Sequence, residues 1–138
     1  MARPCWARSA TAGGAVPRPS GAAAPNLGGC VGGALVSLGR AFGGATRQQD
    51  RREWRAYQTR ELYDSTVTVV GLGAIGTAVV ERSAPFGVES LGVRYTPEKA
   101  GPADEVHGID DLHGVLARTV HLVLAAPLPD ATEVLIVR

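Results

Sequence analysis

Short apolar runs and helix-like spacings follow one another in the second half of the chain. Residues 66–70 form a β-branched run that predicts a buried strand, and apolar positions three and four residues apart predict a helix over residues 74–84. A second strand is predicted at residues 88–95. The continuous apolar run at residues 121–128 is typical of a parallel strand that is buried on both faces.

The segment between these strands completes the pattern. Residues 97–104 are rich in Pro, Gly and charge and predict a loop, which leads to a short strand at residues 106–108 and a helix capped by Asp110. Strands that alternate with helices in this way favour a parallel sheet with right-handed crossovers. We therefore predict an α/β fold: the first half of a doubly wound, Rossmann-type parallel sheet with strand order 3-2-1-4.

Residues 1–46 carry no comparable pattern. They are dominated by Ala, Gly, Pro, Ser and Arg, and we predict that they are disordered because they cannot bury enough apolar surface to offset the ordering entropy. Residues 31–42 have the spacing of a weak amphipathic helix, which their glycines destabilise. An acid-poor targeting peptide is an alternative for this region.

Charge is unevenly distributed along the 138 residues, although the formal net charge is only +1. Residues 1–49 hold five arginines and no acidic residue, and all thirteen acidic residues follow. Residues 47–65 are expected to form a connecting segment: an exposed helix at residues 48–62, anchored by Trp54, and then a short turn at residues 63–65. Acidic residues dilute the basic cluster around Trp54, so a nucleic-acid surface is not favoured.

The sequence gives no sign of export, membrane insertion or metal binding. No apolar run approaches the roughly 20 residues that a membrane span needs, so we expect a cytoplasmic protein without a membrane partner. Cys5 and Cys30 lie in glycine-rich surroundings without a C-x-x-C pair or neighbouring histidines. Neither a metal site nor a disulfide framework is predicted from them.

The first predicted strand leads directly into a glycine motif. Gly71, Gly73 and Gly76 have the spacing G-x-G-x-x-G between the strand and the helix. The first glycine permits a tight turn, the second lets the backbone approach a pyrophosphate, and the third lets the helix pack closely on the strand. Free N–H groups at the start of the helix favour phosphate charge. The motif therefore predicts a dinucleotide-binding turn.

The residues around this motif carry a family resemblance. From about Trp54 to Leu135 the chain resembles the nucleotide-binding domain of the D-isomer-specific 2-hydroxyacid dehydrogenases. The matching segments, in chain order, are Trp54, Glu61-Leu62, Thr66 to Gly76, Ala84 to Val88, Asp111-Leu112 and Ala126-Pro127-Leu128. The sequence departs from the family at Ser83, where an apolar residue usually faces the sheet, and at Leu128-Pro129-Asp130, where Leu-Thr is more usual.

The resemblance implies a set of cofactor contacts. The backbone of residues 72–75 contacts the pyrophosphate, the end of the second strand reads the adenosine ribose, and the end of the fourth strand passes the far half of the cofactor. The candidate cofactor-binding residues are Gly71, Leu72, Gly73, Ala74, Ile75, Gly76, Arg94, Tyr95, Thr96, Ala126 and Pro127.

Arg94 stands where the family usually has an acidic residue that bonds a ribose 2′-hydroxyl. A guanidinium suits a 2′-phosphate, which it binds through two parallel charge-assisted hydrogen bonds, and Thr96 and Lys99 offer further donors. We therefore expect NADP(H) to be favoured over NAD(H). In the alternative, Arg94 merely lies in solvent at the end of a strand.

The resemblance also bears on activity. The family's substrate-binding arginine, its glutamate and its catalytic histidine lie beyond the fourth strand, and no catalytic residue is assigned in this sequence. His107, His113 and His121 are not expected to replace them, because they fall in a loop, on a helix and at a strand start.

We expect an NAD(P)-binding fragment of an oxidoreductase that transfers hydride between a nicotinamide cofactor and a 2-hydroxy or 2-keto acid. It is expected to be inactive alone. Family members are usually homodimers. Two alternatives remain open: a stand-alone module that binds the dinucleotide, and a partner-binding protein whose exposed fourth strand pairs with another chain.

Overall fold

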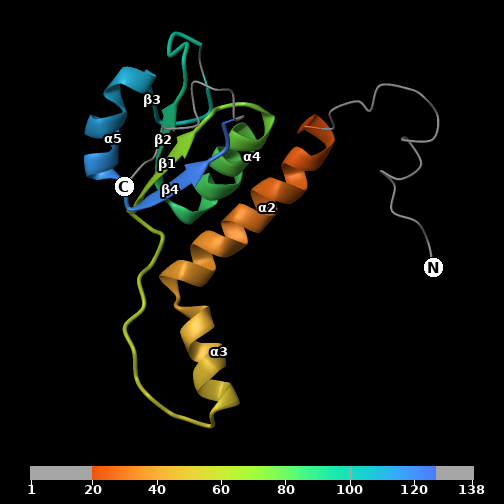
Figure 1. Ribbon diagram of the computed structural model, residues 1–138, viewed down its shortest axis with the longest axis vertical. Coiled ribbons are helices and arrows are strands. Elements are labelled where there is room, and N and C mark those ends of the chain that lie inside the picture. Colours follow the sequence, from red (N-terminus) through yellow and green to blue (C-terminus); the bar gives the residue numbers. More distant parts are fainter. Residues whose placement is uncertain (1–19, 100, 127–138) are drawn as a thin grey trace, which may run out of the picture.

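The computed structural model describes residues 20–99 and 101–126 of the chain. Its centre is a four-stranded parallel sheet with the order β3-β2-β1-β4 (Figure 1). The predicted α/β class, the doubly wound arrangement and the strand order 3-2-1-4 are confirmed.

The element bounds follow the predicted pattern closely in the second half of the chain. The strands are β1 Thr66–Val70, β2 Glu89–Val93, β3 Glu105–His107 and β4 His121–Leu124. The helices are α2 Ser20–Gly39, α3 Phe42–Asp50, α4 Ala74–Ser83 and α5 Leu112–Arg118, with short 3-10 turns η1 Ala84–Phe86 and η2 Ile109–Asp111. Asp110 lies inside η2 and does not cap a helix; Asp111 takes the N-cap position of α5, without a side-chain cap.

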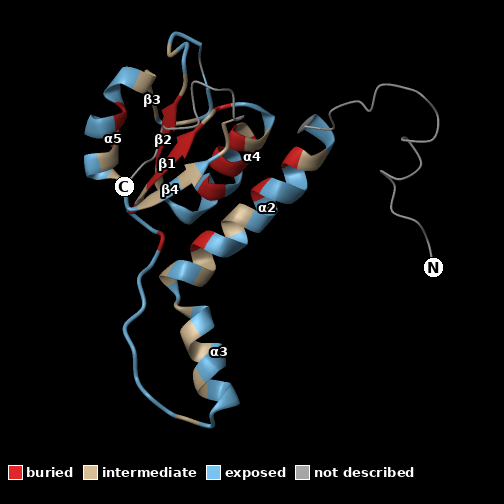
Figure 2. Ribbon diagram, in the orientation of Figure 1, coloured by how far each residue is buried: buried red, intermediate tan, exposed pale blue. Residues whose placement is uncertain are grey.

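The two faces of the sheet are covered by different helices. On one face α4 packs on β1 and α2 lies alongside α4, whereas α5 lies on the other face (Figure 1). Buried residues are concentrated in β1, β2 and α4 (Figure 2). The first face buries Leu35, Leu62, Val67, Val69, Leu72, Val79 and Val80, and the second buries Val70, Leu91, Val93, Leu112 and Val115.

The prediction of disorder for residues 1–46 is wrong for residues 20–46, which form α2 and the first part of α3; residues 1–19 lie outside the described part. The inward face of α2 carries Ala24, Gly28 and Leu35, which are all buried. The small residues Ala24 and Gly28 let α2 lie directly against α4. Burial between the two helices therefore supplies the stabilisation that the glycine-rich sequence lacks by itself. The composition of the segment concealed this long-range contact.

The predicted exposed helix at residues 48–62 is also wrong. Helix α3 ends at Asp50, Arg52 has a left-handed backbone with φ of 54°, and residues 53–61 run without regular structure. This segment returns along the end of α2, where the Arg60 N–H donates to the Gly39 carbonyl at 2.8 Å. Trp54 is fully exposed at 100% and anchors nothing in the described residues.

Helix α2 contradicts the expectation that no segment is long and apolar enough to span a membrane. Over Gly21–Gly39 it is long and apolar enough, by length and composition alone, to cross a membrane. It contains no charged residue from Ser20 to Gly39, and many of its residues are Gly and Ala, with few large apolar side chains. The structure packs one side of this helix against α4.

The prediction that the last strand is buried on both faces is wrong for β4. Val123 packs into the core on the α4 side, whereas Leu122 and Leu124 on the opposite face are 39% and 59% exposed. None of the described elements covers that face of β4. By contrast, Ser83, which departs from the family pattern, is only 1% exposed and donates its hydroxyl hydrogen to the Val79 carbonyl at 2.8 Å.

Candidate functional site

The glycine motif forms a tight turn at the carboxyl end of β1. Gly71 has a φ of 96°, in the left-handed region that favours glycine, and its N–H donates to the Val93 carbonyl at 2.8 Å. A Cβ at Gly71 would lie 2.5 Å from the Ala126 backbone nitrogen. The end of β4 therefore closes over this turn, and only glycine fits there.

Gly76 explains how the following helix approaches the strand. It is buried in the first turn of α4, and a Cβ there would overlap the Gly71 carbonyl oxygen and lie 3.2 Å from a methyl group of Val69. The helix start therefore rests directly on the end of β1, as the sequence predicted for the third glycine of the motif.

Gly73 differs from both of these glycines because its surroundings are open. It is the N-cap residue of α4, with extended backbone angles that other residues can adopt, and a Cβ would meet no atom within 4 Å. The first N–H groups of a helix have no carbonyl partner within the helix, and the helix dipole adds partial positive charge there. This arrangement can receive an anionic group such as a phosphate.

The remaining turn residues have distinct roles in the geometry. Leu72 is buried, and its side chain fills the space left by the absent side chain of Gly92 on β2. Ala74 is exposed and Ile75 is half-buried at the start of α4. Leu72 therefore fastens the turn to the sheet by its side chain, which leaves the backbone of residues 73–75 at the surface.

Arg94 follows β2 directly, beside the glycine turn. Its backbone N–H donates to the His107 carbonyl at 3.1 Å, and its guanidinium Nη1 donates to the Lys99 carbonyl at 3.3 Å. No carboxylate among the described residues forms an ion pair with it. Tyr95 and Thr96 are exposed next to it. Positive charge is therefore available at this end of the turn.

Most of the candidate cofactor residues lie together at one edge of the sheet. Gly71 and Ala126 are in close contact, and the Gly71 N–H bonds the strand end that precedes Arg94. Pro127 lies outside the described residues. The carboxyl ends of β1, β2 and β4 meet here, which is where ligands bind in open α/β sheets.

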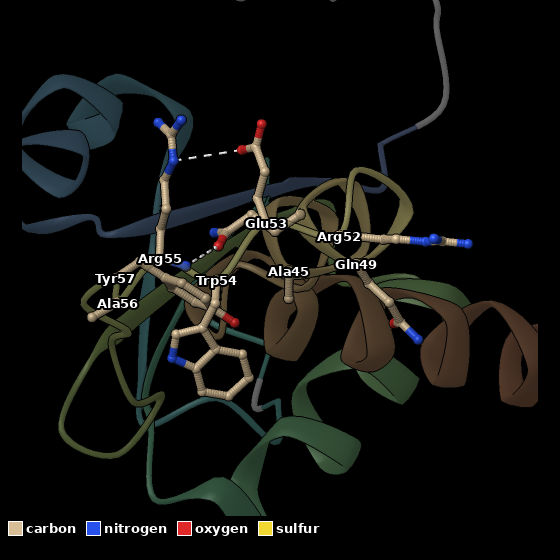
Figure 3. Close-up of a pocket in the computed structure, with 9 residues that line it drawn as sticks. Ala45, Gln49, Arg52, Glu53, Trp54, Arg55, Ala56 and Tyr57 are labelled. Atoms are coloured by element: carbon tan, nitrogen blue, oxygen red, sulfur yellow. Dashed lines mark hydrogen bonds and ion pairs between the residues drawn. The ribbon is translucent and has the colours of Figure 1, made fainter.

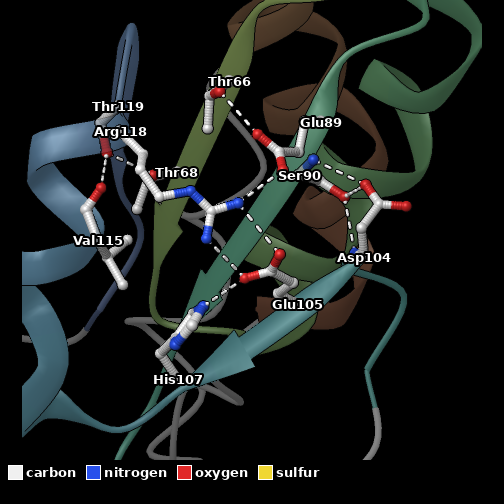
Figure 4. Close-up of polar contacts among 10 residues, drawn as sticks. All are labelled: Thr66, Thr68, Glu89, Ser90, Asp104, Glu105, His107, Val115, Arg118 and Thr119. Carbon is white, nitrogen blue, oxygen red and sulfur yellow. Dashed lines mark hydrogen bonds and ion pairs between the residues drawn. The ribbon is translucent and has the colours of Figure 1, made fainter.

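A second polar cluster lies beneath α5 and was not predicted from the sequence (Figure 4). Arg118 donates from Nη1 to Glu105 Oε2 at 2.9 Å and from Nη2 to Glu105 Oε1 at 3.1 Å and Glu89 Oε1 at 2.7 Å. Hydrogen bonds from Arg118 and then His107 lower the pKa of Glu105, and the Glu105 carboxylate raises the pKa of Arg118. No sequence motif marks this cluster, because Glu105 and Glu89 lie on strands 13 and 29 residues before Arg118 in the chain.

The three histidines do not converge on the glycine turn. His107 ends β3 and bonds Glu105 at 3.0 Å, His113 lies on α5, and His121 begins β4 at the opposite edge of the sheet. Within residues 20–99 and 101–126 no group of three or more His, Cys, Asp or Glu side chains could hold a metal ion.

A hollow between α3 and the following segment is separate from this edge of the sheet (Figure 3). It is lined by Ala45, Gln48, Gln49, Arg52, Glu53, Trp54, Arg55, Ala56 and Tyr57. Arg55 and Glu53 form an exposed ion pair at 3.5 Å, and the Gln48 side chain accepts a hydrogen bond from the Arg55 backbone N–H. Its lining contains none of the candidate cofactor residues.

The comparisons with known proteins agree with one another. The chain is 32% identical over 109 residues to D-3-phosphoglycerate dehydrogenase of Methanocaldococcus jannaschii, which covers 77% of this chain and 21% of that protein. It is also similar to an uncharacterised protein of Corynebacterium melassecola, with 29% identity over 100 residues, 72% of this chain and 31% of that protein. The chain thus spans about a fifth to a third of the length of these relatives.

Solved structures show the same likeness. A D-isomer specific 2-hydroxyacid dehydrogenase family protein from Aeromonas salmonicida has a TM-score of 0.73 at 28% identity, over 79% of this chain and 35% of that one. A probable 2-hydroxyacid dehydrogenase from Rhizobium etli was solved with NADP, HEPES and L(+)-tartaric acid. It has a TM-score of 0.74 at 27% identity, over 80% of this chain and 35% of that one.

The family model described as the NAD binding domain of D-isomer specific 2-hydroxyacid dehydrogenases matches residues 33–138. This match begins within α2, so it includes the last part of α2 and all of α3, which composition alone left out of the domain. Together with the sheet order and the glycine turn, it shows that the chain belongs to the D-isomer-specific 2-hydroxyacid dehydrogenase family and carries its NAD-binding domain.

Proposed function

We propose that the chain binds a nicotinamide dinucleotide with its pyrophosphate against the turn from Gly71 to Gly76. The observation that carries this proposal is the contrast among the three glycines: Gly71 and Gly76 are enclosed by protein, whereas a side chain at Gly73 would meet only open space. Steric crowding in the protein explains the first two glycines. A ligand that approaches the backbone at the helix N-terminus explains the third.

We propose further that NADP(H) binds more tightly than NAD(H), through Arg94. Its guanidinium lies at the end of β2 without a paired carboxylate among the described residues, and Thr96 and Lys99 lie in the same loop. A 2′-phosphate would replace the weak 3.3 Å contact to the Lys99 carbonyl with charge-assisted hydrogen bonds. Among the similar solved structures, the 27% identical Rhizobium etli protein was solved with NADP and a 24% identical formate dehydrogenase from Staphylococcus aureus with NAD. The proposed preference therefore rests on Arg94.

The reaction proposed for the family domain is hydride transfer with a 2-hydroxy or 2-keto acid. The nicotinamide ring supplies the hydride acceptor or donor when bound. The part played by this chain is to hold the dinucleotide. Backbone N–H groups at residues 73–75 would bind its phosphates, and the close contact between Gly71 and Ala126 fixes the turn. We propose that these 138 residues alone do not turn over substrate, because none of their three histidines lies at the glycine turn in the structure.

Calorimetric titration of the purified chain with NADPH and then NADH tests these proposals. We expect saturable binding of both, with NADPH the tighter ligand, and no 2-keto acid reduction when NADPH absorbance is followed. Arg94→Asp should weaken NADPH binding relative to NADH. Equal losses for both cofactors would overturn the role of Arg94, and absence of heat from a folded sample would overturn cofactor binding itself.

A partner-binding role is the second candidate, and one observation favours it. Leu122 and Leu124 expose apolar surface on β4, beside the backbone edge that no described strand pairs. Sedimentation of the same sample discriminates the two candidates. A defined oligomer that forms without cofactor heat supports the partner-binding role, whereas a cofactor-saturable monomer excludes it.

A further inference from the structure

Strand β3 fixes the position at which Arg94 leaves the sheet. It has only three residues and lies at the sheet edge, paired on one side with β2. Its last residue, His107, is opposite Val93, and the His107 carbonyl accepts the Arg94 N–H at 3.1 Å. This is the hydrogen bond that joins the two strands at their carboxyl ends, so movement of β3 would move the backbone of Arg94.

So short an edge strand needs support from outside the ladder, and Glu105 provides it. Both oxygens of its carboxylate accept hydrogen bonds from the Arg118 guanidinium, in the two-pronged geometry that gives directional strength (Figure 4). The same carboxylate bonds His107 Nε2 at 3.0 Å. Glu105 thus joins α5 to the end of β3, next to the carbonyl that holds Arg94.

Arg118 also reaches the neighbouring strand. Its Nη2 donates to Glu89 at 2.7 Å, and Glu89 in turn accepts the hydroxyl hydrogen of Thr66 on β1 at 2.8 Å. Glu89 lies at the amino end of β2, away from Arg94. The two carboxylates therefore share one guanidinium, but only Glu105 is connected to the carboxyl end of the sheet. This difference supplies a matched control.

We propose that Glu105 is a positioning residue for cofactor selectivity, acting through His107 and the backbone of Arg94. The proposal rests on the proposed function, in which Arg94 reads the 2′-phosphate. Glu105 does not touch the cofactor. It holds the strand end in register, so that the Arg94 guanidinium is pre-organised for the phosphate and less ordering is needed on binding.

The experiment compares NADPH and NADH affinities by calorimetry for the whole chain and its variants. Glu105→Ala should weaken NADPH binding by about threefold to thirtyfold, the usual size of such indirect coupling, with a smaller effect on NADH. Glu89→Ala, the matched control, should leave the ratio of the two affinities unchanged. The double variant Arg94→Gln with Glu105→Ala should lose no more selectivity than Arg94→Gln alone.

The outcomes separate the two proposals. If Arg94→Gln leaves the ratio of NADPH affinity to NADH affinity unchanged, the proposed role of Arg94 is wrong. If Arg94→Gln lowers this ratio and Glu105→Ala lowers it further in the double variant, the positioning role of Glu105 is wrong. Equal effects of Glu105→Ala and Glu89→Ala on the ratio of NADPH to NADH affinity would also overturn the positioning role. Melting curves check that each variant folds. Should Glu105→Ala fail to fold, Glu105→Gln and Arg118→Lys take its place in the same cycle, with Glu89→Gln as the matched control for Glu105→Gln. Both replacements keep hydrogen bonding but lose the two-pronged ion pair.

Discussion

Gly28 of α2 lies directly against the backbone of Ala78 on α4: a Cβ on Gly28 would be 2.9 Å from the Ala78 carbonyl oxygen. The next residue, Gly29, points away, and a Cβ there would meet nothing within 4 Å. Two adjacent glycines in one helix therefore have opposite environments. The close approach of α2 to α4 depends on the first of them.

This pair predicts opposite effects on stability. Gly28→Ala should destabilise the fold by about 1–3 kcal/mol, because the added methyl group must push the helices apart. Gly29→Ala should stabilise it by up to about 1 kcal/mol, because alanine is the better helix former. Urea unfolding followed by circular dichroism measures both. Stabilisation by both changes would show that α2 does not pack on α4.

Gly73 and Gly76 should separate cofactor binding from folding. Gly73→Val should abolish NADPH and NADH binding while costing no more than about 1 kcal/mol of stability, since its side chain meets only the space proposed for the pyrophosphate. Gly76→Ala should destabilise by about 1–3 kcal/mol or more, because its methyl group overlaps the Gly71 carbonyl. Calorimetric titration and urea unfolding of both variants test this. Retained binding by Gly73→Val would contradict the proposed site.

Asp104 should make stability depend on acid pH. Hydrogen bonds from the Ser90 hydroxyl and, at 2.7 Å, the Ser90 N–H lower the pKa of this carboxyl. A lowered pKa in the folded state gives stability that is fully present above the unfolded value near 4 and lost as pH falls through the folded value.

Asp104→Asn should therefore lower the free energy of unfolding at pH 7 and flatten its decline below about pH 4. The amide oxygen can still accept the Ser90 N–H, so the change reports mainly on the charge. Urea midpoints between about pH 2 and pH 7 measure this. An acid-induced decline equal to that of the parent chain would show that Asp104 does not contribute to it.

Ser83 should tolerate removal of its hydroxyl group. The hydroxyl donates to the Val79 carbonyl one turn earlier in α4, so Ser83→Ala leaves no buried donor unpaired and should change stability by less than about 1 kcal/mol. Ser83→Leu should destabilise by about 1–3 kcal/mol, because the position is almost fully buried. Thermal or urea unfolding distinguishes them. A stabilising Ser83→Leu would indicate an unfilled space beside α4.

The sheet could be predicted because its signals are local. The run at Thr66–Val70, the glycine motif after it and the apolar spacing before Pro85 each depend on residues close in the chain. The same is true of the candidate turn, because Gly71 and Gly76 meet each other across only five residues. Local sequence therefore determined the strands and the turn, and the alternation of strands with helices determined the strand order.

Only the tertiary structure decided the conformation and burial of the segments that lack a strong local signal. Residues 20–46 fold because small residues such as Gly28 meet α4 some fifty residues later, and Trp54 is exposed because the chain leaves helical geometry at Arg52. Likewise, Arg118 forms hydrogen bonds with Glu105 and Glu89 only when α5 packs on the sheet. Contacts between distant segments depend on the relative placement of whole elements, which composition and periodicity do not encode.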